Sequence, residues 1–212
     1  MRETIENDIE FSGELFYKTF NILKKKSGGK FDFIIKAGNS YISALHKLYE
    51  VVWKTGRKPD KWRDSVLIQL WKGKGDKADL NSRRHLHTRD QTQKYFGHMV
   101  ITAAKPNILK EISPFQIGAI PGHRAQEHLF TLKSVMAIKE KNNTARALQL
   151  LDLSKLFDRE CLIDCLDELY KTKIKGKLYQ LLYELNKDIR VRVRTVVGDS
   201  ETEETGENLA QG

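Results

Sequence analysis

Leu150-Leu151-Asp152-Leu153-Ser154-Lys155-Leu156-Phe157-Asp158 is the most informative stretch of this sequence. An apolar run leads into Asp152, and a second carboxylate, Asp158, follows after an aromatic residue. The run predicts a β-strand over residues 147–153 that delivers Asp152 at its end. A carboxylate on a rigid strand end can bind a metal ion, whereas the same placement is also typical of an aspartate that caps the following turn. Taken alone, the stretch favours the turn.

The charge of the chain is strongly basic. Its 212 residues carry a formal net charge of +9, and residues 199–212 hold five acidic side chains and no basic ones, so residues 1–198 carry +14. Such a surplus favours a polyanionic partner, of which nucleic acid is the commonest. A merely soluble, lysine-rich surface is the alternative. With 40% hydrophobic and 31% charged residues, the composition is that of a folded chain with one large or two small domains.

The two cysteines and the N-terminal sequence indicate the cellular compartment of the protein. Cys161 and Cys165 are one helical turn apart, which is typical of small core residues in a reducing environment, and a zinc site would need further ligands. We find neither a signal peptide nor an apolar run long enough to span a membrane. The expected location is therefore cytoplasmic and/or nuclear, with no membrane partner.

Apolar periodicity predicts an α+β fold, in which strands are interspersed with helices. The expected helices cover residues 12–25, 41–55, 88–104, 125–139, 160–170 and 177–186. The expected strands cover residues 65–71, 115–117, 147–153 and 189–194, with a hairpin turn at Gly198-Asp199.

Two of these segments carry further expectations. The helix at 125–139 should turn its apolar side chains inward, namely Leu129, Leu132, Val135 and Met136. The strand at 189–194 alternates strictly, so one of its faces is apolar and the other carries Arg190, Arg192 and Arg194.

The stretch around Asp152 resembles the first palm motif, D-F-S-K-A-F-D, of the reverse transcriptases of non-LTR (LINE-type) retrotransposons. The resemblance implies that Asp152 is the catalytic, metal-binding aspartate and that the carbonyl of Leu153 touches a second ion. It also implies that Phe157 is the aromatic gate that stacks under the sugar of the incoming nucleotide, and that Asp158 is structural. Leu156 departs from the motif, which has a small residue there.

Upstream, residues 56–76 are similar to the fingers pattern of the same family: G-x-x-P-x-x-W, an apolar strand, then K-x-K-G-D. The resemblance implies that Lys72 and Lys74 reach a triphosphate or a backbone phosphate. Asn81-Ser82-Arg83-Arg84-His85-Leu86 lies where the family has N-Y-R-P-I-S. Arg83 then matches the arginine that grips the incoming triphosphate, although three neighbouring positions depart from the motif.

Three weaker matches follow in the family's order. Lys94 matches a lysine downstream of the arginine motif. Residues 115–124 resemble Q-x-G-F-x-P-G-R-S, a template-facing segment in which Arg124 is the implied phosphate contact. Gln211-Gly212 resembles the Q-G of the second palm motif, which contacts the template–primer pair and the incoming nucleotide.

The resemblance implies part of a right-hand polymerase with an incomplete sheet. Residues 1–145 would be the fingers, with 1–14 as an N-terminal extension, and 146–212 the N-terminal part of the palm. The implied partners are an RNA template, a DNA primer and a deoxynucleoside triphosphate, with two Mg²⁺ ions as cofactors of the full-length enzyme. The family's Tyr/Phe-x-Asp-Asp hairpin has no counterpart in the sequence, so the isolated chain is expected not to extend primers.

Two other interpretations stay open. The chain can be a non-catalytic nucleic-acid-binding protein. Its surface would combine the arginine strand (Arg190, Arg192 and Arg194) with four other cations, Arg57, Lys72, Lys74 and Arg83. It can also be a decayed reading frame without function, in which case exposed sheet edges predict a poorly packed, poorly soluble product.

Overall fold

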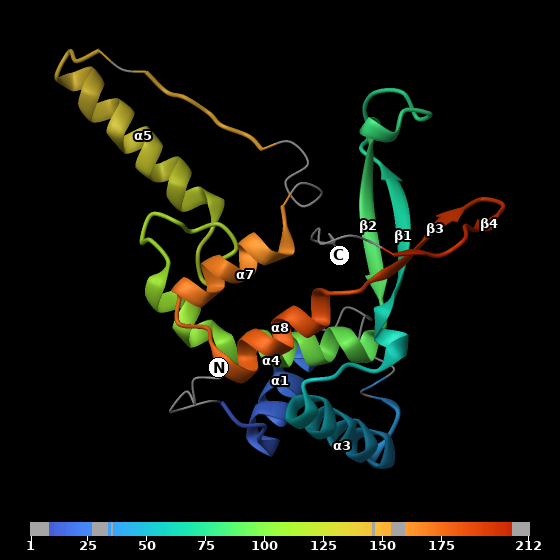
Figure 1. The fold of residues 1–212 in the computed structure, drawn as a ribbon. Helices are drawn as coiled ribbons and strands as arrows, with labels where there is room; N and C mark the ends of the chain where they lie inside the picture. The colour runs from blue at the N-terminus through green and yellow to red at the C-terminus, as the bar shows by residue number, and fades with distance from the viewer. Residues whose placement is uncertain (1–8, 27–33, 35, 146, 154–159, 205–212) are drawn as a thin grey trace. The chain divides into compact units, whose positions relative to one another are not determined.

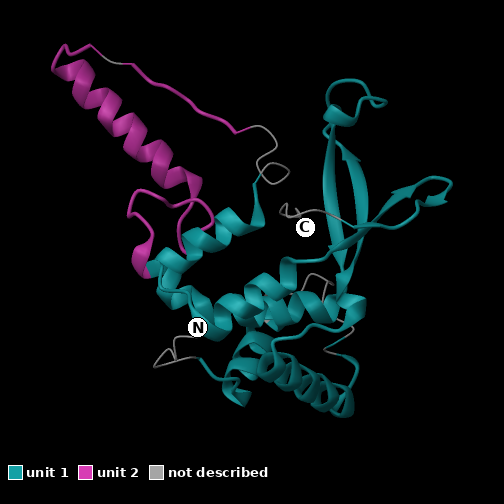
Figure 2. Cartoon of the chain, viewed as in Figure 1, with its two compact units in different colours: residues 1–109, 155–212 teal, residues 110–154 magenta. Residues whose placement is uncertain are grey.

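The computed structural model describes all residues except 1–8, 27–33, 35, 146, 154–159 and 205–212 (Figure 1). The chain divides into two compact units, one of residues 1–109 with 155–212 and one of residues 110–154 (Figure 2). These units are defined by which residues pack together. The boundary expected at residue 145, between the fingers and the palm, is a functional one and stays a prediction.

The described residues form six α-helices and a small, open, mixed sheet. The helices are α1 (Gly13–Lys26), α3 (Asn39–Thr55), α4 (Gln91–Glu111), α5 (Ala125–Lys141), α7 (Leu162–Lys171) and α8 (Gly176–Asn186). The α and β composition agrees with the expected α+β class.

An aromatic cluster forms the centre of the first unit. α1, α3 and α4 contribute Phe16, Tyr49, Trp53, Tyr95 and Phe96, and Trp62 comes from the 3₁₀-helix η1 (Asp60–Arg63). The polar atoms of these rings are satisfied inside the fold: the Tyr95 hydroxyl donates to the Phe16 carbonyl at 2.9 Å, and the Tyr49 hydroxyl to the Thr92 carbonyl at 2.6 Å. Since buried polar groups are costly without partners, these bonds fix how the helices meet.

The sheet has the strand order β2-β1-β3-β4, and β5 also pairs with β3. The strands are β1 (Asp64–Trp71), β2 (Arg83–Arg89), β3 (Arg190–Thr195), β4 (Gly198–Asp199) and β5 (Glu203–Glu204). β1 pairs antiparallel with β2 and parallel with β3, with Asp64 opposite Arg190. The short helix η2 (Leu80–Ser82) leads into β2. The β1–β2 hairpin extends away from the helices of its unit (Figure 1).

The helices expected near 12–25, 41–55, 125–139, 160–170 and 177–186 are confirmed, as are the strands at 65–71 and 189–194. The Ser12 hydroxyl caps α1 by accepting a hydrogen bond from the Leu15 amide at 3.1 Å. The buried stripe of α3 consists of Leu45, Tyr49, Val52 and Trp53.

Other expectations were wrong. Residues 147–153 are not a strand: among the described residues nothing pairs with them, and Leu150 and Leu151 are exposed. Residues 115–117 lie in a turn region. The helix expected at 88–104 begins at Gln91, because residues 83–89 form β2 instead.

Two details of the hairpin and of α5 also differ. Gly198-Asp199 is not the turn but the strand β4, and the turn is at Val196 and Val197. The apolar side chains of α5 do not face a core: Leu129, Val135 and Met136 are exposed, and none of the helix's described residues is buried. Periodicity shows which face of a helix can be buried, but it does not supply the surface that buries it.

Candidate nucleic-acid interface

The loop that joins β1 to β2 holds two of the motifs found in the sequence. Trp71 lies directly opposite Arg83 in the antiparallel register, and the Lys72 amide donates to the Ser82 carbonyl at 2.9 Å, which closes the loop. Within it, the Asp76 and Asp79 side chains each accept a backbone N–H two residues onward, at 2.9 Å. Such Asx turns define the course of the loop without help from the rest of the fold.

The glycines of the K-x-K-G-D run have a structural reason. Gly73 and Gly75 have φ angles of 81° and 79°, in the left-handed region that residues with a Cβ rarely adopt. A Cβ on Gly75 would also lie 2.3 Å from the Ser82 hydroxyl oxygen. The tight turn therefore keeps the lysines on either side of Gly73 close to the start of β2.

The charge at this end of the hairpin is positive. Residues 72–84 include five basic side chains and two acidic ones, a net charge of +3. Lys72 donates to the Asn81 carbonyl at 2.8 Å, and Arg83 donates to the Lys77 carbonyl at 2.6 and 2.9 Å and to the Gln69 side chain at 3.2 Å. In the part of the chain that the structure describes, the hydrogen-bond partners of these two cations are thus neutral oxygens.

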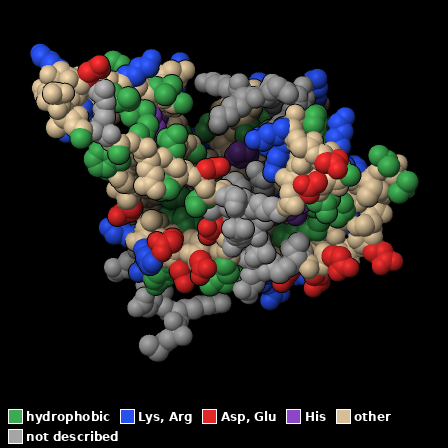
Figure 3. Space-filling view, turned by 90° about the horizontal axis from the view of Figure 1, so that it is seen from above, with side chains coloured by type: hydrophobic (Ala, Val, Ile, Leu, Met, Phe, Trp, Pro, Cys, Tyr) green, Lys and Arg blue, Asp and Glu red, His purple; other side chains and the backbone are tan. Residues whose placement is uncertain are grey.

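Neutral partners orient a cation but do not compensate its charge. Lys74 is exposed, as are Lys72 and Lys77. Figure 3 looks at the molecule from above and shows blue Lys and Arg side chains gathered beside red carboxylates and green apolar groups. Loop residues 72–83 therefore form a basic surface, called here the hairpin end, which can attract phosphates.

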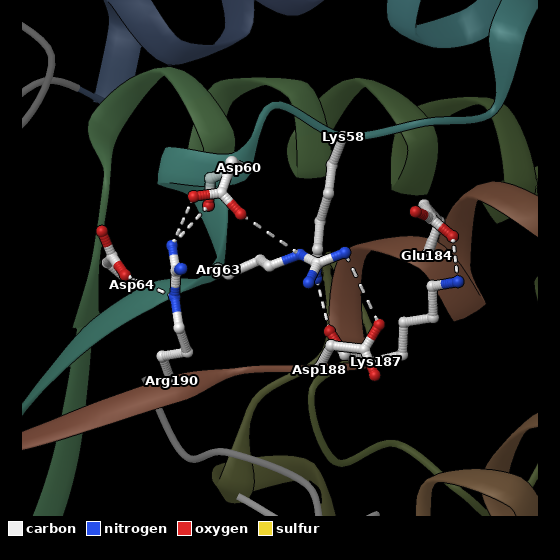
Figure 4. Close-up of polar contacts among 8 residues, drawn as sticks. All are labelled: Lys58, Asp60, Arg63, Asp64, Glu184, Lys187, Asp188 and Arg190. Atoms are coloured by element: carbon white, nitrogen blue, oxygen red, sulfur yellow. Dashed lines mark hydrogen bonds and ion pairs between the residues drawn. The ribbon is translucent and has the colours of Figure 1, made fainter. Parts of the chain in front are cut away.

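The arginine strand is different, because two of its three guanidiniums are already paired with carboxylates. Arg190 lies 2.8 Å from Asp60 and 2.9 Å from Asp64 (Figure 4), and Arg194 lies 2.9 Å from Asp199. Hydrogen bonds to Asp60 and to Asp199 raise the pKa of Arg190 and of Arg194, respectively. Glu203 and Glu204 of β5 lie opposite the start of the same strand. Among the described residues, Arg192 is the one arginine of this strand that is exposed and forms no ion pair with a carboxylate. The strand is therefore a weaker phosphate surface than its sequence indicates.

A charged network that no sequence pattern indicated lies at the base of the hairpin (Figure 4). The buried Lys58 ammonium donates to the Lys187 carbonyl, and desolvation lowers the pKa of Lys58 to about 8. Arg63 lies 3.8 Å from Asp188, and Lys187 lies 2.8 Å from Glu184. These contacts join the segment before β1 to the junction of α8 and β3. No sequence pattern connects residues so far apart.

A second set of contacts fixes β2 at the same base. The Arg89 guanidinium donates to the Asn186 side chain at 3.3 Å, and the side-chain amide of Gln93 donates to the Leu185 carbonyl at 3.4 Å. Burial lowers the pKa of Arg89. The hairpin is therefore anchored at its base by charged and polar contacts, while its other end is exposed.

The other predicted residues lie elsewhere. Lys94 is half-buried on α4 in the first unit. Arg124 is the residue before α5, where its backbone N–H donates to Glu127 at 3.0 Å, and both it and the exposed Asp152 and Leu153 belong to the second unit. Phe157, Gln211 and Gly212 lie outside the described residues.

The described residues do not fit a two-magnesium site. Within the described ranges, no group of three or more His, Cys, Asp or Glu side chains is placed to hold a metal ion. Asp152 and the Leu153 carbonyl offer one carboxylate and one neutral oxygen, too few to replace the hydration shells of two Mg²⁺ ions. Cys161 and Cys165 are free and half-buried.

No helix in the described part of the chain is both long and apolar enough to cross a membrane. The sequence matches no model of a known protein family and no curated protein sequence.

Proposed function

We propose that this chain contains the fingers and the first part of the palm of an RNA-directed DNA polymerase of the non-LTR retrotransposon type. Its partners would be an RNA template, a DNA primer and a deoxynucleoside triphosphate, in the cytoplasm and/or the nucleus. One observation supports the proposal most directly. Lys72 and Lys74 match one motif of that family and Arg83 matches another, and the fold brings the two motifs together at the hairpin end.

The activity that this geometry supports in the chain itself is binding of nucleic-acid phosphates. The hairpin end has uncompensated positive charge on a tightly structured loop, whereas Arg190 and Arg194 are neutralised by carboxylates. A non-catalytic nucleic-acid-binding protein would use the same surface. The polymerase fragment and the non-catalytic binding protein therefore share a first test, which is nucleic-acid binding. They differ in catalysis, which only the polymerase would perform once its remaining parts are present.

The first test is the salt dependence of binding to a labelled primer–template oligonucleotide. The double variant Lys72→Gln/Lys74→Gln is expected to make the negative slope of log binding constant against log salt concentration shallower by about 1.5. The reason is that each lost phosphate contact removes somewhat less than one released counterion. Fluorescence anisotropy at several salt concentrations measures the slope. Binding that does not change with salt would contradict a phosphate-binding function.

The matched control is Lys54→Gln/Lys171→Gln, which removes the same charge from two exposed lysines. These lysines pair with Glu50 at 2.7 Å and with Glu168 at 2.5 Å, so their charges are already compensated. The control is expected to keep the slope of the unmodified chain. An equal loss in both double variants would mean that only net charge matters and that the hairpin end has no special role.

The catalytic half of the proposal has its own test. The chain alone is expected not to incorporate deoxynucleotides on a primer–template in the presence of Mg²⁺, because its described carboxylates do not converge on two ions. A primer-extension assay measures this. Mg²⁺-dependent incorporation that disappears in Asp152→Ala would show that this chain is active by itself.

Reading the genomic locus beyond the codon for Gly212 tests the family assignment. An in-frame Tyr/Phe-x-Asp-Asp would support a polymerase, with Asp152, Phe157 and Gln211 in its active site. A reading frame without that motif would leave nucleic-acid binding, or a decayed gene, as the explanation of the chain.

A further inference from the structure

Trp71 is the exposed member of the three tryptophans. Its side chain is 44% exposed, whereas Trp53 and Trp62 are 2% and 3% exposed. The indole nitrogens of the two buried residues donate to Ile9 and Thr92 inside the fold, and both rings pack against other aromatic rings of the core. The structure therefore accounts for two tryptophans by core packing, and the position of Trp71 needs another explanation.

The Trp71 ring is held in place although it is exposed. Its Nε1–H donates to the Gly75 carbonyl at 3.3 Å, and the Lys77 ammonium lies 5.0 Å from the ring centroid, within range of a cation–π contact. The ring thus keeps a defined orientation while nearly half of the side chain stays accessible. An aromatic surface that is already oriented loses little conformational entropy when a partner binds.

The surroundings of the ring select the kind of partner. Trp71 lies directly opposite Arg83, so both side chains are on the same face of the hairpin, and Lys72 and Lys74 follow it in the loop. Proteins that bind single-stranded nucleic acid combine these two elements: basic side chains that contact the backbone, and an aromatic ring on which a base stacks. The exposed Leu70 and Leu80 nearby would equally suit a protein partner, but that partner would leave the local positive charge unexplained.

We propose that Trp71 is a stacking platform for an unpaired nucleobase, and that the cations of the hairpin end bind the phosphates next to that base. The inference rests on the proposed function, since it requires that this surface binds nucleic acid. It adds that recognition involves the base and not only the backbone, and that the partner is single-stranded where it meets the hairpin end.

Intrinsic fluorescence tests the inference directly, because the exposed tryptophan is the one whose emission a bound base can reach. A 12-nucleotide oligodeoxythymidylate is expected to quench the emission of the chain as it binds. An oligomer of the same length made of abasic sites has the same phosphates and is expected to bind more weakly and to quench far less. Equal quenching by the two oligomers would overturn the inference.

Variants separate stacking from charge. Trp71→Leu is expected to weaken oligodeoxythymidylate binding about tenfold, because base–aromatic stacking is lost, and to leave the salt slope unchanged, because no phosphate contact is removed. Trp71→Phe keeps an aromatic ring and is expected to retain most of the affinity. Lys72→Gln/Lys74→Gln should instead lower the slope. Circular dichroism and a thermal melt check that each variant is folded.

The outcomes distinguish this inference from the function on which it rests. If Trp71→Leu and Trp71→Phe both bind with the affinity of the unmodified chain and the salt slope stays steep, the hairpin end binds phosphates and Trp71 does not stack. If no oligonucleotide binds at low salt, the proposed function and this inference both fail. A weakening in Trp71→Leu that Trp71→Phe rescues supports stacking.

Discussion

Phe96→Ala is expected to lower the free energy of unfolding by about 3–5 kcal/mol, the range found when a large buried aromatic side chain is truncated. The Phe96 ring is fully buried, and its centroid lies 5.2 Å from that of Tyr49, 5.5 Å from Trp62 and 6.1 Å from Trp53. Three segments of the first unit meet at this ring: α3, α4 and η1. Its loss leaves a cavity at their junction, which small shifts of rigid helices cannot fill.

Chemical denaturation followed by circular dichroism measures the change, and Phe130→Ala is the matched control. Phe130 is on α5 and is 74% exposed, so its truncation is expected to change the stability by less than about 0.5 kcal/mol. A broad, non-cooperative transition in the unmodified chain, with no difference between the two variants, would favour the decayed reading frame. A sharp transition that Phe96→Ala shifts and Phe130→Ala does not would show a specifically packed core.

The stability of the chain is expected to rise with pH between about 8 and 10, by roughly 1–3 kcal/mol, because of Lys58. Desolvation lowers the pKa of this lysine from 10.5 to about 8 in the folded chain. Between these two values the unfolded chain binds more protons than the folded one, so raising the pH favours folding. Below about pH 8 both states are protonated, and the buried charge destabilises the fold by a constant amount.

The rise should end near pH 10, where two buried tyrosines act in the opposite direction. Burial raises the pKa of Tyr49 and of Tyr95 above the ordinary value of 10.0. Above that pH the unfolded chain loses protons that the folded chain keeps, and folding becomes less favourable. Stability as a function of pH is therefore expected to have a maximum between about 9 and 10.

Urea unfolding at pH 7, 8, 9 and 10 measures this dependence. Lys58→Met is expected to remove the rise above pH 8, and Lys61→Met is the control, since Lys61 is exposed and three residues away. A stability that stays level over this range in the unmodified chain would mean that the Lys58 ammonium is better solvated than its burial indicates. A rise that persists in Lys58→Met would assign it to another group.

The strands show where sequence reasoning succeeds and where it fails. β1 was predictable because it is a compact apolar run, and such runs form strands when a partner is present. β2 was not, because Arg83-Arg84-His85-Leu86-His87-Thr88-Arg89 has a single apolar residue and becomes a strand only by pairing with β1. The run at 147–153 has the opposite character: its pattern suits a strand, but in the described residues nothing pairs with it.

The candidate interface was predictable to the extent that it is local. The hairpin end is one loop, so its glycines and lysines are neighbours in the sequence and were found there. The pairing of Arg190 with Asp60 and the burial of Lys58 against the Lys187 carbonyl depend on residues more than a hundred positions apart. A charge count includes these groups, but it does not show which of them compensate one another.

The parallel pairing of β1 with β3 has a consequence for how the chain folds during synthesis. β1 and β2 are local and can pair soon after both have left the ribosome, whereas Asp64 finds its partner, Arg190, only after more than a hundred further residues have been made. Contacts between distant segments close large loops and form slowly. Until then one edge of the hairpin is open to pairing with other chains. Aggregation of nascent or refolding chains should therefore be greatest in fragments that contain residues 64–89 and lack residues 190–195.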